Sequence, residues 1–81
     1  MIYQTKKGES VGVSFNFAAE LGVQNIDEYT INASPTIDII HDKTSKAVRA
    51  VIKPGLVGAY SVTCELVGKG IKNSIQVEVS D

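Results

Sequence analysis

Several residue types on which small proteins often depend are scarce or absent from this chain of 81 residues. It has one cysteine, one histidine and no tryptophan, and it has no apolar run long enough to cross a membrane. One cysteine cannot form an intramolecular disulfide, and one thiol with one histidine makes no metal-ligand pattern. These absences exclude a disulfide-stapled module, and we expect no metal and no cofactor.

An excess of charge of one sign is also missing. Eight Lys and Arg residues against nine Asp and Glu residues leave a formal charge of −1, and the lysines are spread along the chain without interleaved aromatics. Such a chain has no general attraction for nucleic acid or for an acidic membrane. We therefore expect neither as a partner. The first twenty residues lack the apolar run of a signal peptide, which predicts synthesis and folding in a cytoplasm.

What the sequence does contain is a two-residue alternation of apolar and polar side chains, the pattern of strands with one buried face. It is clearest at 58–67 and 71–80, which flank the turn Gly68-Lys69-Gly70 and predict a hairpin with Asn73 as the polar residue of its inner face. Further strands are predicted at 2–5, 11–17, 28–32, 36–40 and 46–53.

Seven short strands separated by turns predict the fold class. A sheet that is apolar on one face must bury that face, and in a Greek-key sandwich two sheets bury their apolar faces against each other. The length suffices for one core, so we expect a single immunoglobulin-like, all-β domain over 1–81. Residues 18–21 could form one helical turn that Gly22 would end, and we assign 18–25 to a crossover loop.

No group of side chains in the sequence makes a complete catalytic or metal site. His41 lies near Asp38 and Asp42, but an extended segment would direct Asp38 and His41 to opposite faces, which favours a polar loop at a strand end. Residues 25–28 lack the spaced acids and glycine of a calcium loop. Cys64 is expected on the inner face, where burial raises the pKa of a thiol and makes it a poor nucleophile. We therefore predict that the protein is not an enzyme.

Function would then depend on surfaces, and the first candidate is the N-terminal strand. Ile2 and Tyr3 are large and apolar at the very start of the chain, and Lys6 and Lys7 would end any pairing with a partner strand. The alternative is an ordinary first strand packed on its own sheet.

Two further surfaces are candidates for partner binding. Leu56 and Val57 are apolar beside the Pro54-Gly55 turn, although Leu56 could equally plug the end of the sandwich. The third candidate surface consists of the apolar residues that the alternation places on the outside of the strands, namely Ile40, Val51 and Val67.

The segment from Gly58 to Val62 resembles the Gly-x-Tyr-x-Val entry to the penultimate strand of immunoglobulin-like domains, in which the tyrosine packs at a sheet corner. Over nearly its whole length the chain also resembles a group of small phage-encoded proteins found among head and tail genes. The segments that carry this resemblance are Ile2 to Lys7, Val11 to Phe17, Leu21-Gly22 followed by Ile26, and Gly58 to Val79.

The resemblance implies a virion structural protein, either a tail or neck adaptor or a capsid decoration subunit. Its partners would be other virion proteins and copies of itself, after synthesis in the cytoplasm of the host bacterium. The alternative is a stand-alone binding module for a host factor or a glycan. Glycan binders usually expose aromatic rings, and the five aromatics here are mostly assigned to the core, which favours the virion role.

Overall fold

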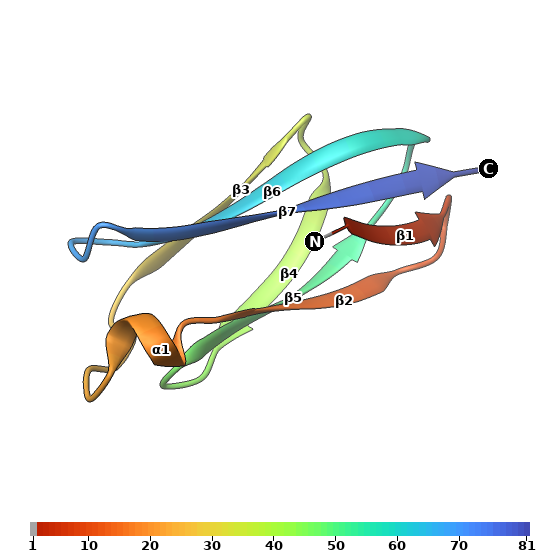
Figure 1. Ribbon diagram of the computed structural model, residues 1–81. Coiled ribbons are helices and arrows are strands. Elements are labelled where there is room, and N and C mark those ends of the chain that lie inside the picture. Colours follow the sequence, from red (N-terminus) through yellow and green to blue (C-terminus); the bar gives the residue numbers. More distant parts are fainter. Residues whose placement is uncertain (1) are drawn as a thin grey trace.

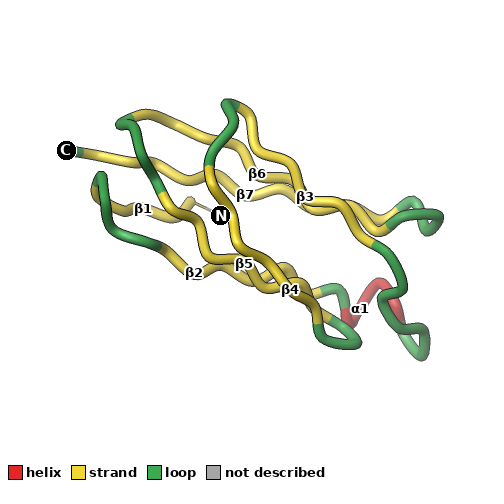
Figure 2. The backbone as a smooth tube through the Cα atoms, turned by 180° about the vertical axis from the view of Figure 1, so that it is seen from behind, coloured by secondary structure: helices red, strands yellow, loops and turns green. Residues whose placement is uncertain are grey.

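A computed structural model describes residues 2–81. The elements are β1 (Ile2–Lys6), β2 (Val11–Asn16), α1 (Ala18–Leu21), β3 (Tyr29–Ser34), β4 (Asp38–Lys43), β5 (Ala47–Lys53), β6 (Gly58–Leu66) and β7 (Ile71–Ser80). The strands form two facing sheets, with the orders β1-β7-β6-β3 and β2-β5-β4 (Figure 1 and Figure 2). The prediction of an all-β sandwich of seven short strands is confirmed.

β1 lies at one edge of the four-stranded sheet. It runs parallel to the second half of β7, from Ile2 opposite Gln76 to Lys6 opposite Ser80, whereas the other described strand pairs are antiparallel. The Lys7 N–H still donates to the Ser80 carbonyl at 2.8 Å, and the chain then turns away. β1 is therefore packed on its own sheet, and its other edge is free.

The core fills the space between the two sheets, because each central strand directs every second side chain inward. The buried residues are Val13, Phe15, Phe17, Leu21, Ile26, Val48, Ala50, Ile52, Tyr60, Val62, Cys64, Leu66, Ile75, Val77 and Val79. The predicted hairpin of β6 and β7 is present, with Leu66 opposite Ile71, and Asn73 is exposed near its turn.

α1 is the single turn that the sequence predicts within its crossover loop. Gly22 ends it with φ of 60°, a left-handed conformation that glycine adopts without strain. Leu21 and, beyond the turn, Ile26 close that end of the core. Within residues 2–81, α1 is the one helix, and it is far too short to cross a membrane.

β4 begins two residues later and ends three residues later than the predicted 36–40, and the prediction of a polar strand-end loop at His41 is wrong. The strand extends from Asp38 to Lys43, so His41 lies inside it. The alternation is broken by the adjacent Ile39 and Ile40, and polar residues follow them, which is why the sequence pattern ends at 40. Main-chain pairing with β5 nevertheless continues to Lys43.

Candidate functional site

The largest of the described concavities lies over the outward face of the three-stranded sheet. It has a volume of about 670 Å³, is open to solvent and has a mainly apolar lining. Gly12 and Ser14 of β2, Ile40 of β4, Val51 of β5 and Tyr3 of β1 contribute to this lining. Concave apolar surfaces with a few polar groups are the usual sites of ligand and partner binding.

The strand register places Gly12, Val51 and Ile40 in one row across this face. Gly12 pairs with Val51, and Val51 pairs with Ile40. Ile40 is 59% exposed and Val51 is 40% exposed. A Cβ added at Gly12 would meet no atom within 4 Å, so the backbone of β2 is bare at this point. A glycine inside a strand weakens it and often marks a place where another chain approaches closely.

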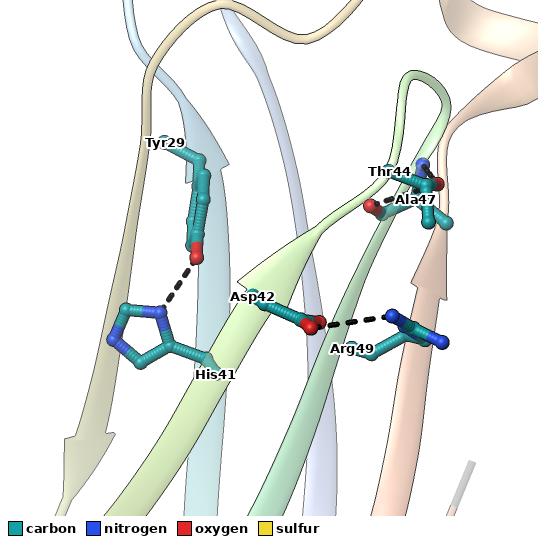
Figure 3. Close-up of polar contacts among 6 residues, drawn as sticks. All are labelled: Tyr29, His41, Asp42, Thr44, Ala47 and Arg49. Atoms are coloured by element: carbon teal, nitrogen blue, oxygen red, sulfur yellow. Dashed lines mark hydrogen bonds and ion pairs between the residues drawn. The ribbon is translucent and has the colours of Figure 1, made fainter.

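The next row carries charge beside the apolar row. Ser14 pairs with Arg49, and Arg49 pairs with Asp42. The Arg49 Nη2 lies 3.2 Å from the Asp42 Oδ2, and both side chains are more than half exposed (Figure 3). Such a surface ion pair contributes little to stability, from about 0 to 1 kcal/mol, so both groups can pair again with a partner.

A second pair of opposite charges lies on the other side of the apolar row, where Asp38 is opposite Lys53. An apolar centre between two polar borders is the usual arrangement of a protein interface. We call this surface the outer β2-β5-β4 face. It consists of Gly12, Ser14, Asp38, Ile40, Asp42, Arg49, Val51 and Lys53.

His41 points away from this face and into the gap between the sheets. Its Nδ1 lies 2.7 Å from the Tyr29 hydroxyl, and the two rings meet edge to face with centroids 5.4 Å apart (Figure 3). The contact joins β4 of one sheet to β3 of the other. Asp38 lies on the opposite face from His41, as predicted, since its partner Lys53 points outward.

The surroundings of Tyr29 keep its hydroxyl neutral. Partial burial raises the pKa of Tyr29, and the charge of Asp42 and that of the Cys64 thiolate, which forms only at alkaline pH, add to this effect. Within residues 2–81 no group of three His, Cys, Asp or Glu side chains is placed to hold a metal ion. The role that the geometry assigns to His41 is a contact between sheets.

The variant Tyr29→Phe should lower the free energy of unfolding by about 1 kcal/mol or less, because it removes one exposed hydrogen bond and leaves the ring in place. Urea unfolding followed by circular dichroism measures this. In a double-mutant cycle with His41→Ala the two changes should not be additive, since both remove the same bond. Fully additive losses would contradict the contact.

The structure separates the residues predicted for partner binding into two places. Ile2 is exposed beside Gln76, near the middle of β7, whereas Tyr3 is half-buried and lines the concavity at the outer β2-β5-β4 face. Leu56 and Val57 lie at the end of the sandwich, just before β6. Both pairs include exposed apolar side chains, but they do not form one surface.

The interpretation of Leu56 as a plug for the end of the core is wrong, because its side chain is 71% exposed. The buried ring of Tyr60 lies in that part of the core instead, and its hydroxyl donates to the Leu56 carbonyl at 2.9 Å. Only the backbone of Leu56 is needed there. A tyrosine whose hydroxyl forms a hydrogen bond with the backbone a few residues upstream is the tyrosine corner of immunoglobulin-like domains.

The third predicted surface is partly confirmed. Ile40 and Val51 are neighbours and both are exposed, but Val67 follows β6 in the other sheet and does not join them. Sequence reasoning missed Gly12 and Ser14. A signal existed, because both are small residues at outward positions of a strand whose inward positions are large and apolar.

Cys64 is completely buried, as predicted. Burial raises the pKa of its thiol to about 11, as expected for a buried thiol that makes a poor nucleophile.

Comparison with known proteins supports the fold and leaves the function open. No family model matches the chain, and no curated protein matches it. Among solved structures it is similar to the crystal structure of the titin M3 domain, with 18% sequence identity and a TM-score of 0.53 over 99% of this chain and 90% of that one. At this identity the likeness shows the fold alone, which is an immunoglobulin-like sandwich.

Proposed function

We propose that this protein is a non-catalytic module that binds protein partners through the outer β2-β5-β4 face. The observation that carries the proposal is the row of exposed Ile40 and Val51 beside the bare backbone of Gly12. Burying two exposed apolar side chains is favourable, and the charged borders supply orientation. The bare glycine allows a partner's side chain to reach the main chain of β2.

The assembly that we propose for this module is a phage virion. There the protein would act as a head, neck or tail adaptor or as a capsid decoration subunit, in contact with other virion proteins. One support is the resemblance of the sequence to small phage-encoded head and tail proteins. The other is the exposed apolar row on the outer β2-β5-β4 face of this small domain. Weak contacts of this kind become effective when many copies bind at once.

A stand-alone module for a host factor or a glycan is the second candidate. Sugar rings usually stack on exposed aromatic side chains. Among the described residues no aromatic side chain is fully exposed, since Tyr3 and Tyr29 are half-buried and the other three are buried. The site therefore favours a protein partner over a glycan.

Quantitative mass spectrometry of purified particles of the encoding phage or prophage tests the virion role. The protein should be present, and its copy number should match either the major capsid protein, which indicates decoration, or a small ring, which indicates an adaptor. Absence from washed particles contradicts the virion role and favours the stand-alone module.

The same particles test the binding face. Ile40→Lys should reduce the copy number at least tenfold, because it places a charge in the apolar row without disturbing the core. The matched control is Asn32→Lys, an exposed outward position on β3, the edge strand of the other sheet. Equal incorporation of both variants would contradict the assigned face.

A further inference from the structure

We infer that the occupant of the outer β2-β5-β4 face is a second copy of this chain, packed face to face about a two-fold axis parallel to β5. This inference rests on the proposed use of the face for protein contacts and adds the partner and its orientation. A two-fold interface requires a self-complementary surface, in which residue i contacts residue j and residue j contacts residue i.

The apolar row has this property about β5. β5 is the middle strand, with β2 on one side and β4 on the other. Rotation about an axis along β5 places β2 of each copy over β4 of the other. Ile40 of each copy then lies over the bare backbone at Gly12 of the other, where there is open space for a side chain. The two copies of Val51 meet at the axis.

The charged rows select this axis over the other two-fold arrangement. With the axis along β5, the two copies of Arg49 meet at the axis, but each lies between its own Asp42 and that of the second copy, and Asp42 of each copy faces Ser14 of the other. The two copies of Asp42 and the two copies of Arg49 together have a net charge of zero. An axis across the strands would also set carboxylates against each other, since Asp42 would face Asp38 in addition to Arg49 facing Lys53.

The size of the face sets the strength of the contact. Three strands about 4.8 Å apart, with six residues of about 3.3 Å rise each, give a face of roughly 14 by 20 Å. The two copies together would bury roughly 560 Å² of flat area, which is well below the ~1,200 Å² that marks the lower end of stable complexes. We expect a weak dimer of the isolated protein, with a dissociation constant that is micromolar or weaker.

Gly12→Val is the deciding variant. The added side chain clashes with nothing in the monomer, and valine favours an extended strand, so the variant should be at least as stable as the natural protein. In the dimer it occupies the space that Ile40 of the second copy needs. Sedimentation velocity over a concentration series up to about 1 mM should show a concentration-dependent dimer for the natural protein. Gly12→Val should weaken it at least tenfold.

Two further variants make the test specific. Ser61→Val, at an exposed outward position of the other sheet, should leave the dimer unchanged. Asp42→Arg should weaken the dimer, and the double variant Asp42→Arg/Arg49→Asp should restore it, because the exchange preserves the charge pattern about the axis.

The possible failures are distinguishable. A natural protein that is monomeric at every concentration overturns the second-copy inference, whereas the loss of Ile40→Lys from particles still supports a different partner at the same face. A dimer that Gly12→Val does not weaken uses another surface, and this also overturns the inference.

Discussion

Replacing Tyr60 with alanine should lower the free energy of unfolding by about 3 kcal/mol or more. The ring is 7% exposed and packs in the core between the sheets, so its removal leaves a cavity. The variant also loses the hydrogen bond to the Leu56 carbonyl, which fixes the loop between β5 and β6. A domain of this size has a total stability of only about 5–10 kcal/mol, so the alanine variant should lie close to its unfolding threshold.

Tyr60→Phe separates the two contributions. It keeps the buried ring and loses the hydroxyl, so the loss should be about 1 kcal/mol. Urea unfolding of both variants followed by far-ultraviolet circular dichroism measures the difference, since the chain has no tryptophan for fluorescence. An alanine variant that loses less than about 1 kcal/mol would show that the ring does not fill the core.

The fold could be predicted where one face of a strand is completely buried. β5 alternates between buried and exposed positions from Val48 to Lys53, and β6 alternates from Tyr60 to Leu66 with only Thr63 partly exposed, and the sequence shows the same alternation. β4 has only one partner strand and mostly exposed side chains. Hydrophobic burial therefore leaves a weak pattern in its sequence, and main-chain pairing, which the pattern does not record, decides where it ends.

The candidate site could be predicted only in part, for a related reason. Period-two alternation is local, and it identified Ile40 and Val51 as outward apolar residues. It does not say which strands are neighbours, so it could not place Gly12 beside Val51 or separate Val67 from the other two. The position of an open glycine is a property of the register between strands, which depends on contacts far apart in the chain.

The stability of the protein should fall as the pH rises from about 9 to about 11 because of Cys64. The unfolded thiol has a pKa near its ordinary value of 9.0, and burial raises the folded pKa to about 11. Below pH 9 both states keep the proton, so the full stability is present. Between these values only the unfolded state loses the proton, which favours unfolding. At about 1.4 kcal/mol per pKa unit, the complete loss is roughly 2–3 kcal/mol.

Cys64→Ala isolates this effect from the other groups that titrate at alkaline pH. The variant starts from a lower stability because it leaves a small cavity, but its free energy of unfolding should decline less between pH 9 and 11. The raised pKa of Tyr29 lowers stability at still higher pH in both proteins, because burial is its largest cause, although Cys64→Ala removes the smaller contribution of the thiolate to that shift. Urea unfolding at pH 8, 9, 10 and 11 gives the two curves. Parallel curves would mean that the thiol is accessible to water and that β3, β6 and β7 do not enclose it.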